Sequence, residues 1–543
     1  MAKADTLAPS APARYASRGM VASASPAAAA VGLRVLMDGG NAFDAAVATA
    51  LVEGLTLPAS CGLGGDMFAV LYDARSRSTY AINGSGVAAG WASRDYYVSR
   101  GHTQMPLYGV HSVSVPGAPD AYWTLHQRFG SRPWSKLVEP AITCAEDGIA
   151  LSAALARSIG NQKKFLDDPA STATFLAGGQ PPEAGAVFRR PDYARSLRTL
   201  AQDGPEPFYR GSIARETCTY LQAQGGLLEE ADFAGHATEV YAPLRTTYRD
   251  VEVCSTAPPS QGMIILEWLN LLESFDLAGS GFGTAETLHL MAETKKLAFA
   301  DRLRYAGDPR FIDVPLNELL SKSFAARRLQ ALDRRRAATQ VEGALPEALH
   351  GDTSSFCVAD GQGNMVSFIH SLSAGFGSGV TAGETGILLN NRAGRGFTLE
   401  EGHPNVIQGG KRTMHTLNCY LLLRDGQPYA VGGTPGGDQQ PQWNVQTITN
   451  VVDFGQHAQQ AADAPRWYSF PGTDPVFDSK PFDVRLESRF GPDTVAGLVA
   501  RGHQVVDIGP WGSPGAIQLI QRLPNGVLAG GSDSRAGGIA LGW

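Results

Sequence analysis

The pattern of apolar and polar residues changes near residue 353. Before it, helical spacing and helix-boundary residues predict helices at 27–37, 42–54, 135–147, 152–167, 189–203, 284–306 and 324–337, with a strand at 66–72. After it, short apolar runs between Gly or Asp-Gly turns predict strands at 354–359, 365–371, 386–390, 418–423, 429–432, 516–521 and 527–531, with one helix at 443–452. Helices mostly early and strands mostly late favour a layered fold of helices and sheets over a doubly wound one.

The helix expected at 284–306 has the clearest amphipathic pattern in the chain. Apart from Lys295, one of its faces carries only apolar residues, namely Leu288, Met291, Ala292, Phe299 and Leu303. We therefore expect one buried face and one solvated face. The stretch 338–352 that follows the helical region is polar and irregular, which predicts an exposed linker.

Composition is that of an ordinary folded, soluble protein. The 543 residues are 43% hydrophobic and 18% charged, with a formal net charge of -7. This length allows several domains or one large interwoven domain. The mild acidity and the lack of a dense Lys/Arg stripe argue against a nucleic-acid partner.

The six cysteines stand at 61, 144, 218, 254, 357 and 419, and none has CxxC or another metal-ligand spacing. We expect reduced, unpaired thiols. Residues 1–18 have no apolar run of signal-peptide length, and no other run is long enough to cross a membrane. We therefore expect a disordered stretch at 1–18, a cytoplasmic location and no membrane partner.

Thr353 stands where the polar linker ends and a strand begins, and a series of motifs surrounds it. After it come Gly-rich or Asn-rich motifs at 376–379, 386–391 and 432–437; before it come motifs at 39–42, 62–66, 114–117, 248–250, 300–302 and 307–309. In this order they resemble the γ-glutamyltransferase family of N-terminal nucleophile hydrolases, from about residue 19 to the C-terminus. The nearest branch is the oxamate amidohydrolase-like one.

The resemblance implies an α+β fold with four layers, an αββα sandwich built from both parts of an autocleaved chain. The large subunit would be 19–352, and the small subunit would be 353–543. The Asp352–Thr353 bond would be cut when the Thr353 hydroxyl attacks the Asp352 carbonyl. An N-terminal Thr has its own base, because an α-amine with a pKa of about 7.7–8.0 can accept the hydroxyl proton.

The same resemblance gives roles to four further residues. Ser371 takes the place of the hydroxyl residue that bonds the nucleophile's amine, and Ser373 that of an Asn that helps hold substrate. Gly436 and Gly437 match the paired glycines whose backbone N–H groups form the oxyanion hole. Without the family, Thr353 would read as structural, both Ser as a polar strand edge and both Gly as a turn.

The chain departs from the family at the residues that bind the α-carboxylate and the α-amine of a γ-glutamyl donor. The place of the Arg that holds the α-carboxylate falls at Ser85, and the Ser-Ser pair falls at His415 and Thr416. The acidic place that holds the α-amine falls among Arg392 and Arg395. Two Arg would repel a cationic amine and suit a carboxylate. We therefore expect an amide whose acyl part is acidic and lacks an α-amine.

An alternative for Arg392 and Arg395 is that both are solvated or paired with Glu400 or Glu401. The segment 397–411 is also short where some relatives carry a lid. A more open site would favour hydrolysis over transfer to an amine.

Other functions stay open at this stage. Within the fold, the rivals are a γ-glutamyltransferase or glutathione hydrolase and a cephalosporin-type β-lactam side-chain acylase. Outside it, the rival is an unprocessed, non-catalytic binding protein. There is no Gly-x-Ser-x-Gly elbow and no HExxH motif. We expect no metal and no organic cofactor, a small-molecule amide substrate, and the two subunits of one precursor as partners, with a homo-oligomer of heterodimers also open.

Overall fold

Two seven-stranded sheets lie face to face in the computed structural model, which describes residues 12–543 apart from 177, 340, 342–351 and 471–481. The first sheet has the order β1 (Arg14–Ala16), β18 (Leu528–Ser532), β17 (Gln518–Arg522), β13 (Gln427–Gly433), β12 (Tyr420–Arg424), β9 (Val251–Ser255), β8 (Leu244–Tyr248). The second has the order β19 (Ile539–Gly542), β2 (Gly19–Ser23), β10 (Asp352–Asp360), β11 (Met365–Ser373), β3 (Asp66–Asp73), β4 (Ser78–Gly84), β7 (Glu239–Tyr241).

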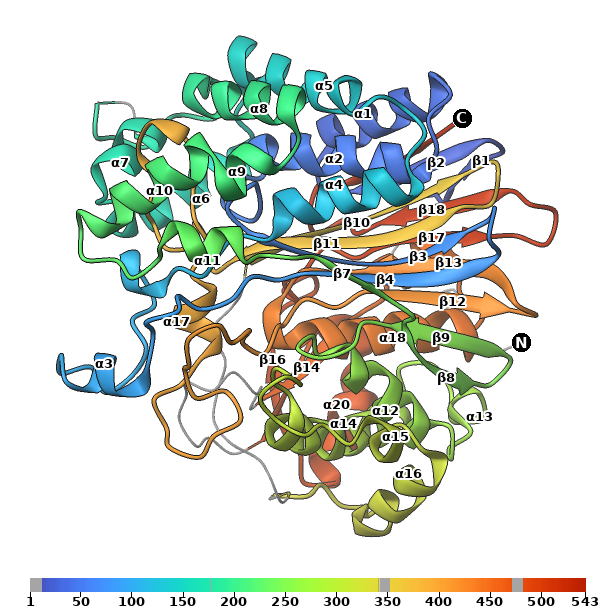
Figure 1. Cartoon of the computed structure of the whole chain (residues 1–543). Coiled ribbons are helices and arrows are strands. Elements are labelled where there is room, and N and C mark those ends of the chain that lie inside the picture. The colour runs from blue at the N-terminus through green and yellow to red at the C-terminus, as the bar shows by residue number, and fades with distance from the viewer. Residues whose placement is uncertain (1–11, 177, 340, 342–351, 471–481) are drawn as a thin grey trace.

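Helices cover the outer face of each sheet, so the molecule has four layers (Figure 1). Over the second sheet lie α1 (Pro26–Met37), α2 (Ala42–Thr56), α4 (Ala118–Phe129), α5 (Trp134–Asp147) and α8 (Pro191–Asp203). Against the first sheet lie α12 (Gly262–Leu272), α14 (Ala285–Tyr305), α18 (Gln440–Val452) and α20 (Pro492–Ala500). Three main apolar clusters fill the three interfaces, and the middle one, between the sheets, includes Phe68, Ile369, Leu421 and Ile520.

Both sides of residue 353 contribute strands to both sheets. The second sheet takes β2, β3, β4 and β7 from before Thr353 and β10, β11 and β19 from after it. The first sheet takes β1, β8 and β9 from before and four strands from after. The predicted αββα sandwich, interwoven from both parts of the chain, is confirmed.

The central strands are buried on both faces, and this explains their sequence pattern. Every residue of β3 and of β11 is buried, between the opposite sheet and the overlying helices. A strand covered on both faces carries a continuous apolar run rather than an alternating one. The run at 66–72 fits this pattern, whereas β11 also carries buried Ser367, His370 and Ser371 among its apolar residues.

Several expected elements differ from the structure. Residues 14–16 form β1 and pair with β18, so the expected disorder of 1–18 is wrong there; residues 1–11 lie outside the described part. The apolar run at 386–390 is no strand, because it makes only one isolated bridge, Thr381 to Leu388. The basic helix expected at 324–337 is α16 (Lys322–Arg328) followed by a short 3-10 turn. Of the expected linker 338–352, only 338, 339, 341 and 352 are described.

The helix expected to be amphipathic, α14, is buried nearly all round. All residues from Thr287 to Arg302 are buried, including Lys295, because α12 and α20 pack on α14. Its polar residues are therefore interior groups with partners, and the prediction of a solvated face is wrong.

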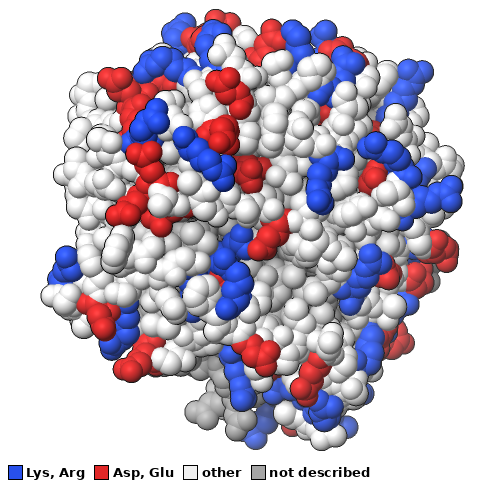
Figure 2. Space-filling model, in the orientation of Figure 1, with Lys and Arg blue, Asp and Glu red and all other residues white. Residues whose placement is uncertain are grey.

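The distribution of surface charges and the state of the cysteines agree with the expectations from the composition of the sequence. On the face shown in Figure 2, acidic and basic side chains are interspersed rather than gathered by sign. All six cysteines lie in described segments and none forms a disulfide. Among the described helices, none has the length and apolar character needed to span a membrane.

Candidate active site

Thr353 lies at an irregularity in the ladder between β10 and β11. Asp352 pairs with Ser373 and Ser354 pairs with His370, so Thr353 falls in the register shift between them. Between these two pairs β10 has one residue, Thr353, and β11 has two, Ser371 and Leu372, so the extra residue of the bulge lies on β11 opposite Thr353. The Thr353 hydroxyl, 5% exposed, donates to the Ser371 hydroxyl across 3.0 Å. The structure thus brings together the two hydroxyl residues that the sequence singled out.

Ser373, the last residue of β11, lies opposite Asp352 at this end of the hairpin and has an unusual backbone conformation. Its φ is +89°, a region that residues with a side chain seldom adopt, and its N–H donates to the Ser371 hydroxyl across 2.7 Å. Its carbonyl accepts from Nη1 of Arg395 across 3.0 Å. Its own hydroxyl is buried and has no hydrogen-bond partner among the described residues. A buried hydroxyl of this kind is available to a ligand.

The paired glycines follow β13, which packs across β10 and β11 from the opposite sheet. Gly433, the last residue of β13, lies against Ser355: a Cβ added at Gly433 would be 2.4 Å from the Ser355 hydroxyl. Gly436 has φ +134° and Gly437 has φ +57°, so the turn is built in glycine conformations. The carbonyl of Gly437 accepts from Nε2 of Gln261 across 3.1 Å. Backbone N–H groups in such a turn carry no side chain that would obstruct an anion.

A buried ionic cluster adjoins the hydroxyl pair. Asp66 of β3 pairs in register with Ser371, and its Oδ2 lies 3.1 Å from Nε2 of His415 and 3.4 Å from Nε of Arg392. Its Oδ1 accepts from the Gly86 N–H across 3.1 Å. Although burial alone would raise it, the contacts with His415 and Arg392 lower the pKa of Asp66. Asp66 is therefore an anion at neutral pH.

His415 is neutral in this cluster. Burial first, and then the charge of Arg392, lower the pKa of His415 to about 4. Because Nε2 faces an ionised carboxylate, Nε2 carries the proton and Nδ1 keeps its lone pair. Nδ1 is buried without a hydrogen-bond partner among the described residues. The site therefore offers one hydrogen-bond acceptor here, and no charge.

The two arginines do not behave as the alternative interpretation supposed. Both lie on α17 (Arg392–Gly396) and are 1% and 2% exposed, so they are not solvated. Arg392 pairs with Asp66, while Glu401 lies 3.9 Å from Arg94 instead. Pairing of Arg392 and Arg395 with Glu400 or Glu401 is therefore wrong.

Ser85 and Thr416 lie beside the cluster, where the Ser85 hydroxyl and the Thr416 carbonyl already have partners. The Ser85 hydroxyl donates to Oδ1 of Asn83 across 2.6 Å, and the Thr416 carbonyl accepts from Nδ2 of Asn418 across 2.9 Å. The carbonyl of Ser85 accepts from Nε of Arg412 across 3.0 Å. A guanidinium thus does lie at Ser85, but it comes from a different part of the chain and also pairs with Glu239.

Sequence reasoning missed three contributors to this site. Asp66 stood at the end of a quoted motif without a role, and Gln261 bridges Gly437 to the His415–Thr416 segment without belonging to any motif. Asp438, directly after the glycine pair, forms a buried ion pair with Arg302. Asp66 lies inside a quoted motif, as does Arg302, the partner of Asp438. This was the only signal that the sequence offered for them.

Two groups of potential metal ligands occur among the described residues, and we assign a metal to neither. In the first, both ring nitrogens of His370 already have partners, Oε2 of Glu53 and the Tyr122 hydroxyl, each at 2.8 Å. In the second, Glu293 is paired at 2.6 Å with Lys296. A metal would have to displace these contacts.

A cavity of about 820 Å³ lies between α7 (Pro169–Phe175), the start of α8 and α10 (Ser212–Gln222). None of the predicted site residues lines it. Its Tyr220 and Arg190 bond Asp168 and the Gly386 carbonyl, and both contacts tie protein segments together. The cavity is therefore separate from the hydroxyl pair of Thr353 and Ser371.

Comparison with known proteins gives matches over nearly the whole chain. The family model described as gamma-glutamyltranspeptidase matches residues 28–543. The glutathione hydrolase-like YwrD proenzyme of Bacillus subtilis is 36% identical, over 96% of this chain and 98% of that protein. The oxamate amidohydrolase proenzyme of Klebsiella pneumoniae is 32% identical, over 97% and 98%. The cephalosporin acylase of Bacillus halodurans superimposes with a TM-score of 0.92 and 35% identity, over 100% and 99% of the two chains.

Proposed function

The chain belongs to the gamma-glutamyltranspeptidase family, and from this premise we propose that it is a self-processing amidohydrolase whose nucleophile is Thr353. As a member of this family it is an N-terminal nucleophile hydrolase that acts on amide bonds. The observation that carries the proposal is the 3.0 Å contact between the Thr353 and Ser371 hydroxyls at the shifted start of β10. The relatives named as proenzymes support a precursor that is cut into two subunits.

Maturation would use the same hydroxyl as turnover. Thr353 Oγ1 attacks the Asp352 carbonyl, its proton passes to the departing Thr353 nitrogen, and an ester replaces the peptide bond. Water then hydrolyses the ester, which frees the carboxylate of Asp352 and the α-amine of Thr353. The register shift between β10 and β11 lies at Thr353, next to the bond that would be cut.

Turnover would follow from the freed amine. The amine takes the hydroxyl proton as Oγ1 attacks the substrate carbonyl, and the Ser371 hydroxyl holds the nucleophile in place. Backbone N–H groups of Gly436 and Gly437 would stabilise the oxyanion. The amine then gives its proton to the leaving nitrogen, and water resolves the Thr353 ester. No step in this sequence calls for a metal or an organic cofactor.

For the substrate, we propose an acyl group that carries a carboxylate and no α-amine. The buried guanidinium of Arg395 donates to the Ser373 carbonyl, and Arg392 of the same short helix is held by Asp66. Guanidinium groups bind carboxylates in bidentate geometry. A substrate ammonium would be repelled by the same groups. Family members that bind γ-glutamyl donors carry hydroxyl side chains at the place of His415 and Thr416. His415 offers a neutral hydrogen-bond acceptor instead, which also suits a different acyl group.

A second candidate is an acylase that removes a side chain from a β-lactam nucleus. The similarity to the Bacillus halodurans cephalosporin acylase over the full length of both chains favours it. The two candidates share the nucleophile and differ only in the leaving amine. A substrate panel therefore separates them.

The test is a set of 4-nitroanilides of succinate, butyrate and γ-glutamate, with an acylated cephalosporin as the fourth substrate. We expect kcat/KM for the succinyl anilide to exceed that for the other two anilides at least about 10-fold, since a charged hydrogen bond contributes about 1.5–3 kcal/mol. Arg395→Met should raise KM for the succinyl anilide about 10- to 100-fold and leave the butyryl anilide unchanged. Arg395→Lys, which keeps the charge, serves as the matched control.

Equal rates on succinyl and γ-glutamyl anilides would contradict the acidic-acyl proposal while leaving the nucleophile in place. Cleavage of the cephalosporin alone would establish the acylase instead. If Arg395→Met affected the succinyl and butyryl anilides alike, the effect would be structural and the clamp would be excluded.

A further inference from the structure

We propose that Trp443, held by the buried ion pairs around Arg466, sets the position of the Gly436–Gly437 turn and is a positioning residue for hydrolysis. The proposal rests on the proposed role of this turn as the oxyanion hole. Trp443 is fully buried in the first turns of α18 and does not belong to the hydroxyl or arginine groups described above.

Trp443 lies against the glycine turn from behind. A Cβ added at Gly436 would be 2.3 Å from Cζ3 of the indole, and one added at Gly515 would be 2.7 Å from the same atom. The edge of the ring therefore fills the space between two glycine backbones. Contacts this close mean that a shift of the ring shifts the turn, because protein interiors have almost no free space.

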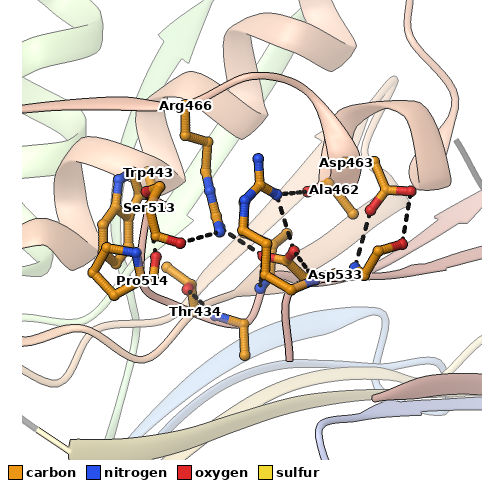
Figure 3. Close-up of polar contacts among 12 residues, drawn as sticks. Thr434, Trp443, Ala462, Asp463, Arg466, Ser513, Pro514 and Asp533 are labelled. Atoms are coloured by element: carbon orange, nitrogen blue, oxygen red, sulfur yellow. Dashed lines mark hydrogen bonds and ion pairs between the residues drawn. The ribbon is translucent and has the colours of Figure 1, made fainter. Parts of the chain in front are cut away.

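Arg466 contacts the indole ring of Trp443 and is itself held by buried polar groups. Its guanidinium carbon lies 5.2 Å from the Trp443 ring, and its Nη1 lies 2.7 Å from Oδ2 of Asp533 (Figure 3). Its Nη2 donates to the Ser513 carbonyl across 3.4 Å. Burial lowers the pKa of Arg466 to about 10, so it stays charged at neutral pH.

The ion pairs continue beyond Arg466. Arg535 contacts Oδ1 of Asp533 at 3.0 Å and Oε2 of Glu487 at 2.7 Å, and Glu487 also pairs with Arg489. Buried ion pairs add little net stability compared with apolar packing, because desolvation offsets their attraction. A cluster of this size behind a catalytic turn is better explained by the geometry that it fixes.

A second connection joins the cluster to the turn. Oε1 of Glu487 accepts from the Ser513 N–H across 3.1 Å, and the Ala516 N–H donates to the Thr434 hydroxyl across 3.2 Å. Thr434 precedes Gly436 by two residues. The segment 513–516 is therefore anchored to the cluster at one end and to the strand before the turn at the other.

The position of the turn affects the reaction rate, because oxyanion donors act only over a narrow range of distances. They need to lie about 2.7–3.1 Å from the developing oxyanion, and removing one donor lowers kcat about 10²- to 10³-fold. A displaced donor loses part of that effect. Ground-state binding depends much less on the turn, so KM should stay nearly constant.

The experiment compares Trp443→Phe with Trp268→Phe. Trp268 is also fully buried and lies in α12, in the apolar cluster between the first sheet and its helices, so it controls for loss of a buried indole. Both variants are assayed as mature two-chain enzymes on the anilide that wild type cleaves fastest, with kcat, KM and melting temperature measured. For Trp443→Phe we expect kcat to fall about 10- to 100-fold with KM within twofold. Trp268→Phe should lower the melting temperature and leave kcat within twofold.

Arg466→Lys provides the second variant, since it keeps the charge beside Asp533 but changes the stacking on the indole. It should give a smaller loss of kcat than Trp443→Phe, again without a change in KM. If kcat of Trp443→Phe stays within twofold of wild type, or falls no more than that of Trp268→Phe, the proposal is overturned. Should Trp443→Phe fail to fold, an unchanged kcat in Arg466→Lys overturns it equally. Failure of the proposed function would look different, because wild type itself would then cleave no amide.

Discussion

The site has two halves that are built differently. The half that we propose to be reactive, with Thr353, Ser371 and the Gly436–Gly437 turn, lies at strand ends, and its hydroxyls contact each other directly. The half that we propose for substrate recognition is a buried ionic cluster in which Asp66 holds both Arg392 and His415. Asp66 and His415 are 349 residues apart in sequence. The two halves are joined at Ser373, whose N–H donates to the Ser371 hydroxyl and whose carbonyl accepts from Arg395.

The sharpest test of the reactive half is Ser371→Ala. It removes the acceptor of the Thr353 hydroxyl and of the Ser373 N–H. We expect turnover to fall about 10²- to 10³-fold, within the range for positioned proton-transfer partners, and self-cleavage to slow in parallel. Ser371→Thr, which keeps a hydroxyl, should remain near wild type. Ser367→Ala removes another buried hydroxyl of β11, one that donates to the Gly432 carbonyl, and serves as the matched control. Loss of activity in the Thr variant as well would show that Ser371 acts by shape alone.

In the recognition half, Asp66→Asn should mainly lower the free energy of unfolding. It leaves Arg392 buried without this carboxylate, and breaking a buried ion pair from one side costs about 3–5 kcal/mol. The free energy of unfolding is measured by urea denaturation in the uncleaved Thr353→Ala background, so that one chain unfolds. Arg34→Gln, which breaks the exposed Arg34–Asp38 pair, should cost less than about 1 kcal/mol. A small loss for Asp66→Asn would mean that the cluster is not the framework of this half.

The smallest effect concerns acid stability. The folded pKa of His415 is about 4, below its usual 6.5, so the unfolded chain binds its proton first as pH falls. The stability linked to neutral His415 is complete above pH 6.5 and is lost as pH falls towards 4. Between pH 7 and 5 this amounts to about 2 kcal/mol. His415→Asn should therefore lose about 2 kcal/mol less than the parent over that interval, in paired urea titrations. Equal losses in both proteins would show that His415 is protonated in the folded state.

The contrast between the halves also explains what could be predicted from sequence. Strands β10, β11 and β13 were predictable because short stretches rich in apolar residues stand between Gly or Asp-Gly turns. The run at 386–390 looked the same, but its Leu388 bridges only Thr381, and burial alone does not distinguish these cases. Thr353, Ser371 and the glycine pair followed from motifs in order along the chain.

Partners in the recognition half could not be predicted, because an ion pair depends on distance in space. The alternative interpretation had Arg392 solvated or paired with Glu400 or Glu401 close by, and it pairs with Asp66 on β3. Trp443 and Arg466 belong to no motif quoted from the sequence, and Arg466, which lies over the Trp443 ring, is held by Asp533, far along the chain. Helix α14 was misread for a related reason: its polar residues have interior partners, such as Glu293 for Lys296.

The most direct test of the account is the intact mass of purified wild-type protein beside Thr353→Ala. We predict two wild-type fragments that meet between residues 352 and 353, and a single uncut chain for Thr353→Ala. A wild-type chain that stays whole after prolonged incubation, or a Thr353→Ala chain that is cut at the same bond, would contradict Thr353 as the nucleophile.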